Sequence, residues 1–280
     1  MYAYRIGSKG HLISSSPARA LPRGPIDLTF APDSRHGYIT LGYLRNAAIQ
    51  NFTLSDEGVL DLVGSPIPLG ERKDSLSTAR VSADGKQLYL ASYLRGEVLR
   101  LPIAPDGTVD HVAQRIATGK SPLNPTVTRD GRFVYVSNEM AHSVSGYRVA
   151  EDGSLSEVPG SPFPSGRWPH VSAITPDSRH VYVPNLGSTF FSCYEVQEDG
   201  SLREFAQVDF GDAKPEAAAV SPSGNALWVF GNDGSRRGTR TVLRRYAIEE
   251  DGSLTGNLSL PLELKAASGH SVVIAAARAE

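Results

Sequence analysis

Two histidines and one glutamate stand at spacings that suit acid–base chemistry. His170, Glu216 and His270 follow one another at intervals of 46 and 54 residues. A histidine that titrates near neutrality can act as a general base when a carboxylate orients its second ring nitrogen. We expect Glu216 to orient His170 in this way, and these three residues form the predicted catalytic cluster.

Cationic side chains near this cluster could bind an anionic substrate. Lys214 and Arg167 could hold an anionic group or stabilise a developing oxyanion. A repeated Tyr-Leu-Arg ends at Arg45 and Arg95 and could present two guanidinium groups to a carboxylate or phosphate, although an ordinary solvated arginine is the alternative. The other predicted substrate-binding residues are Trp168, Glu139, His142, Asn185, Asn124 and Asp27.

A metal ion is another way to equip such a site. Asp27, Asn124, Asn138, Asn185 and Glu216 offer oxygen ligands that calcium accepts, whereas two nearby histidines would suit a softer transition ion. No Asp-rich loop spacing demands either ion. We therefore expect no required metal or cofactor and keep a divalent ion as an alternative.

A repeated unit must position these residues. Glycines recur 46 to 52 residues apart, at Gly10, Gly58, Gly107, Gly153, Gly200 and Gly252. Each unit alternates apolar and polar residues, as in residues 181–184, and is punctuated by turns such as Asp199-Gly200. A second turn recurs at residues 32–35, 83–86, 129–132, 176–179 and 222–225. This pattern predicts four short antiparallel strands per unit, with no helical periodicity.

Repeated four-stranded antiparallel units predict an all-β fold of the β-propeller class. Five units are complete, and the two ends of the chain supply parts of a sixth. Residues 2–12 match a third and fourth strand, and residues 269–274 match a first strand. We expect a single domain over residues 1–280 with six blades, the last closed by both termini. A truncated seven-blade ring and strand exchange between two chains are the alternatives.

The predicted cluster occupies one aligned position of the repeat. In a propeller, the loops before each first strand and after each second strand open on the same face, around the central channel. The residues aligned at the start of the first strands are Ile26, Ser77, Leu123, His170, Glu216 and His270. The alternative to catalysis is that His170 and Glu216 form a buried ion pair that only plugs the channel.

Composition excludes several classes of function. The net charge of −2, with a pI near 6.4 and no run of Lys or Arg, argues against nucleic-acid binding. The chain has no stretch of 18 apolar residues and begins directly in a strand pattern, so we expect a cytoplasmic protein without a membrane partner. The lone Cys193 is predicted to be a core residue and not a nucleophile. The oligomeric state is left open.

Several motifs resemble the lactonase-type propellers, a group that includes bacterial 6-phosphogluconolactonase and the carboxymuconate lactonizing enzymes. The motifs are Gly-Ser-Pro-Ile-Pro-Leu-Gly at 64–70, Gly-Ser-Pro-Phe-Pro-Ser-Gly at 160–166 and Asp-Gly-Arg-Phe-Val-Tyr-Val-Ser-Asn at 130–138. The likeness covers nearly the whole chain and implies the propeller fold.

The resemblance extends unevenly to the site. Pro169-His170 resembles the family's Pro-His, Asn185 begins a segment that resembles its Asp-Leu-Gly, and Asn138-Glu139 resembles its Asn-Glu one blade earlier than expected. Ser172 replaces the family's second His, and Glu216 lies where the family has Pro-Arg-His. These departures argue against a sugar phosphate lactone and leave a lactone, ester or cyclisation substrate.

Two function classes follow from these features. The first is a lactonase-type enzyme of small-molecule metabolism, a hydrolase or a cyclising enzyme, that acts on a small anionic substrate with His170 as base. The second is a non-catalytic propeller that binds a peptide or protein at its channel mouth. The polar ring of aligned residues favours the enzyme.

Overall fold

The computed structural model describes residues 4–6, 11–14, 20–21, 24–42, 46–69, 74–232 and 241–262. The chain forms two compact units, Met1–Ala117 and Thr118–Glu280.

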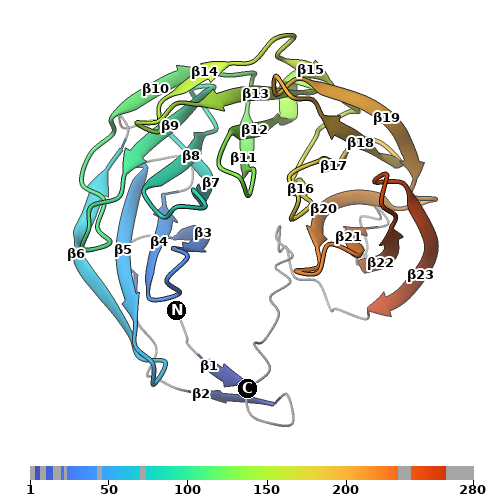
Figure 1. Ribbon diagram of the computed structural model, residues 1–280. Helices are drawn as coiled ribbons and strands as arrows, with labels where there is room; N and C mark the ends of the chain where they lie inside the picture. The colour runs from blue at the N-terminus through green and yellow to red at the C-terminus, as the bar shows by residue number, and fades with distance from the viewer. Residues whose placement is uncertain are drawn as a thin grey trace. The chain divides into compact units, whose positions relative to one another are not determined.

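The first unit contains a hairpin and two complete antiparallel sheets, blades 1 and 2, coloured blue to green in Figure 1. The hairpin pairs β1 (Tyr4–Ile6) with β2 (Leu12–Ser14). Blade 1 has the strand order β3 (Pro25–Phe30), β4 (His36–Leu41), β5 (Ala48–Leu54) and β6 (Leu60–Pro68). Blade 2 has the order β7 (Leu76–Val81), β8 (Gln87–Ser92), β9 (Glu97–Pro102) and β10 (Gln114–Ala117).

The second unit contains three antiparallel sheets, blades 3 to 5, coloured green to red in Figure 1. Blade 3 consists of β11 (Pro122–Val127), β12 (Phe133–Asn138), β13 (Ser143–Val149), β14 (Leu155–Glu157) and the short β15 (Phe163–Pro164), which pairs with β13. A 3-10 turn, η1 (Glu139–Ala141), joins β12 to β13. Blade 4 consists of β16 (Ala173–Ile174), β17 (His180–Pro184), β18 (Phe190–Val196) and β19 (Leu202–Asp209). Blade 5 consists of β20 (Lys214–Val220), β21 (Ala226–Asn232), β22 (Thr241–Ile248) and β23 (Leu254–Leu262).

The turns between first and second strands have the geometry that the sequence predicts. In blade 4, Oδ1 of Asp177 accepts the backbone N–H of Arg179 at 3.0 Å, and Ser178 adopts a left-handed φ of 66°. In blade 3, Asp130 accepts the N–H of Arg132 at 3.1 Å in the same way. An aspartate that binds its own turn stabilises it locally, so these residues are structural.

Neighbouring blades are joined through the glycine that recurs in the sequence. The Tyr135 hydroxyl of blade 3 donates to the Gly200 carbonyl of blade 4 at 2.8 Å, and Tyr182 donates to Gly252 of blade 5 at 2.9 Å. A Cβ atom at Gly200 would lie 2.3 Å from the Phe133 ring, so only glycine allows this close approach. The apolar core lies between the facing sheets, where strand residues of adjacent blades pack together.

The blade architecture agrees with the predicted β-propeller class of four-stranded antiparallel units. The strands β1 and β2 pair with each other, as expected for a third and fourth strand. Residues 263–280 lie outside the described residues, and so does the first strand predicted at 269–274. Six-blade closure, its alternatives and the single domain therefore stay predictions.

Candidate functional site

The aligned positions at the start of the first strands coincide with a break in strand pairing. The register between first and second strands shifts between Pro25 and Asp27 in blade 1, and between Pro215 and Ala217 in blade 5. Blades 2 and 3 shift at the same place. In blade 4 the bridge at Pro169 is separated from the regular ladder that starts at Ala173. Such bulges turn side chains out of the sheet pattern and are frequent beside active sites.

His170 lies at this break in blade 4 and reaches blade 5. Its ring is buried, and Nδ1 lies 3.0 Å from the backbone carbonyl oxygen of Glu216. Because a carbonyl oxygen only accepts hydrogen bonds, Nδ1 must carry the proton. A neutral ring in this tautomer has its lone pair on Nε2, which is the form a general base needs.

The backbone at the break reinforces this contact. The N–H of Val171 donates to the same Glu216 carbonyl at 3.2 Å, and the N–H of Ala218 donates to the carbonyl of Val171 at 2.9 Å. The N–H of His170 itself donates to Pro184 at 2.9 Å. The imidazole is therefore held by two blades at once.

The backbone and the side chain of Glu216 have different partners. Its carbonyl oxygen, which belongs to the backbone, contacts the His170 ring. The carboxylate is buried, and its Oε2 accepts a hydrogen bond from Nδ2 of Asn232 at 3.0 Å. The hydrogen bond at His170 Nδ1 therefore comes from the backbone of Glu216, and a role of its carboxylate in catalysis stays a prediction. Lys214 lies on the same strand, half-buried and paired with Asn232 in the register of β20 and β21.

A second pair of site residues meets across the loops of blades 3 and 4. Nδ1 of His142 accepts the backbone N–H of Trp168 at 3.2 Å, and the Arg167 guanidinium lies 5.1 Å from the Trp168 ring centroid. Both His142 and Trp168 have a left-handed backbone, with φ of 53° and 55°. A left-handed tryptophan is uncommon, and such backbone strain concentrates at functional sites.

The loop of blade 4 supports Arg167 and Trp168 from the other side. The N–H groups of Gly187 and Leu186 donate to the carbonyls of Arg167 and Trp168, each at 2.9 Å. A Cβ atom at Gly187 would lie 2.8 Å from Cβ of Arg167, so the glycine permits this close contact. Glu139 lies half-buried in η1, and its carbonyl is 3.1 Å from Nδ1 of His142. Four predicted residues, His142, Glu139, Arg167 and Trp168, are therefore brought together.

Asn185 is held by hydrogen bonds to two serines, and its predicted substrate contact stays a prediction. It is fully buried, its Oδ1 accepts the Ser165 hydroxyl at 3.0 Å, and its Nδ2 donates to Ser192 at 3.2 Å. Asn138 of blade 3 makes equivalent contacts, accepting from Thr118 at 2.8 Å. Both amides fix the segment that leads into the first strand of their own blade.

Asp27 and Asn124 also link blades. Oδ2 of Asp27 accepts the backbone N–H of Ala79 at 3.0 Å and a guanidinium N–H of Arg80 at 2.9 Å. Nδ2 of the buried Asn124 donates to the carbonyl of Ser172 at 3.2 Å. These bonds join one first strand to the start of the next blade, and the role of both residues in substrate binding stays a prediction.

The remaining predicted residues divide between the surface and the undescribed part of the chain. Nε of Arg95 lies 3.3 Å from Oε2 of Glu97, which also pairs with Arg115 at 3.2 Å. Arg95 is exposed, which agrees with either the recognition role or the solvated alternative. His270 and Arg45 lie outside the described residues.

Cys193 is buried in β18, as predicted. Burial, together with the negative charge of Glu204, raises the pKa of its thiol to about 12. A thiol with so high a pKa carries almost no thiolate at neutral pH and is a poor nucleophile.

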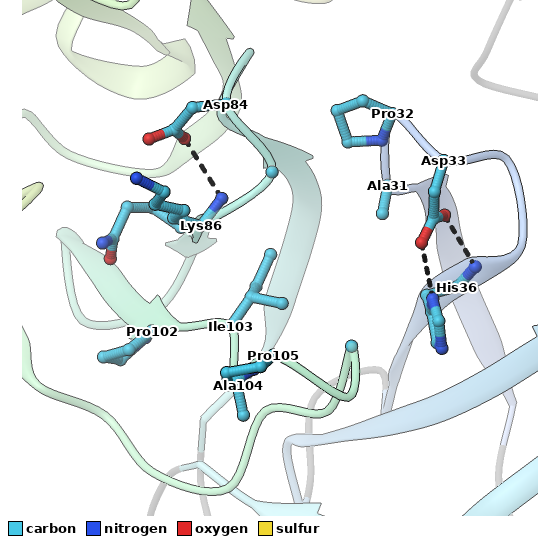
Figure 2. Close-up of a pocket in the computed structure, with 13 residues that line it drawn as sticks. Ala31, Pro32, Asp33, His36, Asp84, Lys86, Pro102, Ile103, Ala104 and Pro105 are labelled. Atoms are coloured by element: carbon cyan, nitrogen blue, oxygen red, sulfur yellow. Dashed lines mark hydrogen bonds and ion pairs between the residues drawn. The ribbon is translucent and has the colours of Figure 1, made fainter.

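One groove with polar residues was not anticipated from the sequence. In the first unit, a cavity of about 600 Å³ is lined by turns of blades 1 and 2 (Figure 2). Nδ1 of His36 lies 2.6 Å from Oδ2 of Asp33. Burial raises the pKa of Asp33, but the bonds from the His36 ring and from the backbone of His36 and Arg35 outweigh it and lower the pKa to about 2.

This groove recurs elsewhere in the repeat. Blades 4 and 5 form a similar cavity of about 430 Å³ that Asp177 and His180 line. The groove therefore follows from the way the turns of adjacent blades stack. We place the candidate site at the bulges of the second unit, where the side chains differ from blade to blade.

The predicted absence of a required metal concerns clusters of side chains that could ligate an ion. In the part of the chain that the structure describes, no three His, Cys, Asp or Glu side chains are arranged to hold a metal ion. Within the same residues, no helix is long and apolar enough to cross a membrane.

Comparison with solved structures places the fold among known proteins. A periplasmic gluconolactonase of Pseudomonas aeruginosa, PpgL, aligns with a TM-score of 0.69 at 19% identity, over 93% of this chain and 91% of that one. A candidate 6-phosphogluconolactonase of Bacteroides uniformis aligns with a TM-score of 0.63 at 18% identity, over 94% and 93%.

A protein of unknown function from Desulfotomaculum acetoxidans aligns with a TM-score of 0.72 at 16% identity, over 88% of this chain and 73% of that one. No protein-family profile matches the sequence. The fold is therefore that of the lactonase-type propellers. Since unrelated functions share this fold, the activity must be argued from the site.

Proposed function

We propose that the protein is a lactonase-type hydrolase that opens a small anionic lactone, with His170 as the general base. The observation that carries this proposal is the contact of His170 Nδ1 with the Glu216 carbonyl, which fixes the tautomer needed for a base. The fold shared with a gluconolactonase supports the reaction class.

The proposed reaction is a proton transfer coupled to acyl transfer. Nε2 of His170 takes a proton from water as the water oxygen attacks the lactone carbonyl carbon. The tetrahedral oxyanion then collapses, the ring C–O bond breaks, and His170 returns the proton to the departing ring oxygen. The product is an open-chain hydroxy acid, and the base is regenerated.

Cationic residues around His170 support an anionic substrate. Arg167 is exposed, lies three residues before His170 and stacks on the Trp168 ring. Lys214 begins the strand that carries Glu216. A guanidinium or ammonium group placed here would bind a substrate carboxylate or phosphate and stabilise the developing oxyanion.

The test is a hydrolysis screen with three substrates. Gluconolactone, 6-phosphogluconolactone and an uncharged aliphatic lactone are incubated with the purified protein, and acid release is followed against a blank without protein. We expect hydrolysis above the blank, with a higher kcat/KM for an anionic lactone than for the uncharged one. The variant Cys193→Ala should retain the activity because its buried thiol takes no part.

Failure of the screen would favour the other function class. A folded protein that hydrolyses none of the three substrates above the blank would contradict the proposed reaction on these lactones. Lactone binding without turnover, measured by calorimetry, would indicate a binding propeller instead.

A further inference from the structure

The contact between His142 and Trp168 has an uncommon arrangement of donors and acceptors. Nδ1 of His142 faces the backbone N–H of Trp168 at 3.2 Å and the carbonyl oxygen of Glu139 at 3.1 Å. One of these groups only donates and the other only accepts. A single ring nitrogen can therefore satisfy one of them at a time.

The protonation state of the ring decides which of the two bonds forms. When Nδ1 is unprotonated, it accepts the N–H of Trp168. When His142 becomes an imidazolium, both ring nitrogens are donors, and Nδ1–H binds the Glu139 carbonyl while the Trp168 N–H loses its acceptor. The contact with Trp168 thus depends on a neutral ring.

His142 reaches the segment that leads directly to His170. Its backbone carbonyl accepts the N–H of Ser165 at 3.0 Å, so the same residue holds this segment at two points. Only the bond to Trp168 changes with protonation, because the other is formed by the backbone. Two residues beyond Trp168, the chain continues into His170.

The charged groups near His142 come from three segments. Glu139 lies on its own loop, and Arg167 is carried by the segment that His142 binds. Lys120 lies on the connection before β11, where its carbonyl accepts the N–H of Met140 at 3.2 Å. The contacts at Nδ1 determine which of the two hydrogen bonds forms.

We propose that His142 is a positioning residue whose neutral ring holds Trp168 and Arg167 in place for substrate binding and whose protonation releases this hold. The assignment to substrate binding rests on the proposed function. The release itself is a property of the loops and can be measured without any substrate.

The decisive experiment follows the backbone amide of Trp168 by NMR. The chain contains two tryptophans, so ¹⁵N-tryptophan labelling gives two backbone signals, and Trp228→Phe identifies them. Trp228 lies within the ladder of β20 and β21 and serves as the internal control. Between about pH 8 and pH 5, the range in which histidine changes charge, the Trp168 amide should shift and the Trp228 amide should stay.

Variants assign the shift to one ring. His142→Asn should abolish the shift, because asparagine tolerates the left-handed backbone and does not titrate. His111→Gln, a change at an exposed histidine of the first unit, should leave it intact. A shift that persists in His142→Asn, or that disappears only in His170→Gln, would overturn the proposal.

Kinetics provide the link to substrate. If the protein hydrolyses a lactone, His142→Asn should raise KM by about 2- to 10-fold at pH 8, the effect of losing one hydrogen bond, with a smaller change in kcat. An unchanged KM beside a clear NMR effect would overturn the substrate-binding role. A missing hydrolytic activity beside the NMR effect would refute the proposed function and leave the release by His142 established.

Discussion

At the residue scale, backbone groups select the chemistry of two histidines. His170 donates to a carbonyl and His142 accepts from an N–H, so the two rings carry opposite tautomers when neutral. His170 then presents a lone pair on Nε2, and His142 presents a donor there. Under our two proposals, the same residue type serves as base in one loop and as positioning residue in the other.

A conservative change at Glu216 separates the effect of its carboxylate on the reaction from the effect of its backbone carbonyl. Glu216→Gln keeps the backbone acceptor of His170 and removes one negative charge. We expect kcat at the pH optimum to change by less than about 10-fold, because the backbone carbonyl still holds the His170 ring. A collapse of kcat at every pH would instead assign the carboxylate a direct part in the reaction.

The asparagines at the ends of the second strands in blades 3 and 4 have a structural role. Asn185→Ala should destabilise the protein by about 1–3 kcal/mol, because Ser165 and Ser192 lose a buried partner. Asn138→Ala is the matched change in blade 3 and should cost a similar amount. Urea unfolding measures both, and a cost below about 0.5 kcal/mol for Asn185→Ala would contradict its structural role.

These residues show where sequence reasoning reaches its limit. Asn138, Asn185 and Asn232 occupy the same aligned position, yet only Asn232 binds the Glu216 carboxylate. The sequence located His170 and Glu216 at one aligned position, because the repeat fixes where each strand starts. It could not show that a carbonyl orients the ring, since side-chain spacing says nothing about backbone acceptors at a bulge.

At the element scale, turns and strands were predictable because their signals are local. Aspartate and glycine mark each turn, and alternation marks each strand, so the four-stranded core of each blade in the described residues follows from the sequence, whereas the short β15 of blade 3 does not. The bulge in each first strand was not predicted. Between blades 4 and 5 it coincides with backbone bonds from Val171 to Glu216 and from Ala218 to Val171, which is a tertiary effect.

The contact between blades 4 and 5 is predicted to be sensitive to acid. Burial lowers the pKa of His180, with Asp177 opposing and Arg179 assisting, and its ring packs against Gly252. The unfolded chain therefore binds a proton more readily than the folded protein, so stability falls as pH drops below the unfolded pKa of about 6.5.

His180→Phe tests this contribution with a residue that the repeat already uses. Phe133 occupies the equivalent place in blade 3, against Gly200. The variant should keep its packing and lose less Tm than the wild type between pH 8 and pH 5. Equal losses of Tm in both proteins would assign the acid sensitivity to other groups.

At the scale of the whole molecule, the prediction concerns closure of the propeller. Removal of residues 1–14 takes away the hairpin of β1 and β2 and should expose an unpaired sheet edge. We expect a lower Tm and aggregation by size-exclusion chromatography. Removal of residues 1–3 alone is the control, and a full deletion variant that stays monodisperse with an unchanged Tm would contradict terminal closure.

The fold was more predictable than the site for a physical reason. Every blade repeats the same turns and strands, so each repeat confirms the others, whereas Arg167, Trp168 and His142 occur once each in loops. Their contact joins residues 26 positions apart through a backbone N–H, and no sequence pattern marks it. The contacts between the loops could therefore be found only in the structure.

The most direct test of the account is turnover and melting temperature measured on the same variant, His170→Ala, with a lactone that the wild type hydrolyses. Loss of a general base should lower kcat by about 10² to 10⁴, and the fold should survive because His170 lies at a strand start. His111→Ala, the exposed control, should keep both values. A His170→Ala protein that melts far below the wild type yet retains its kcat would contradict the account. It would show that His170 has only a structural role in filling the channel.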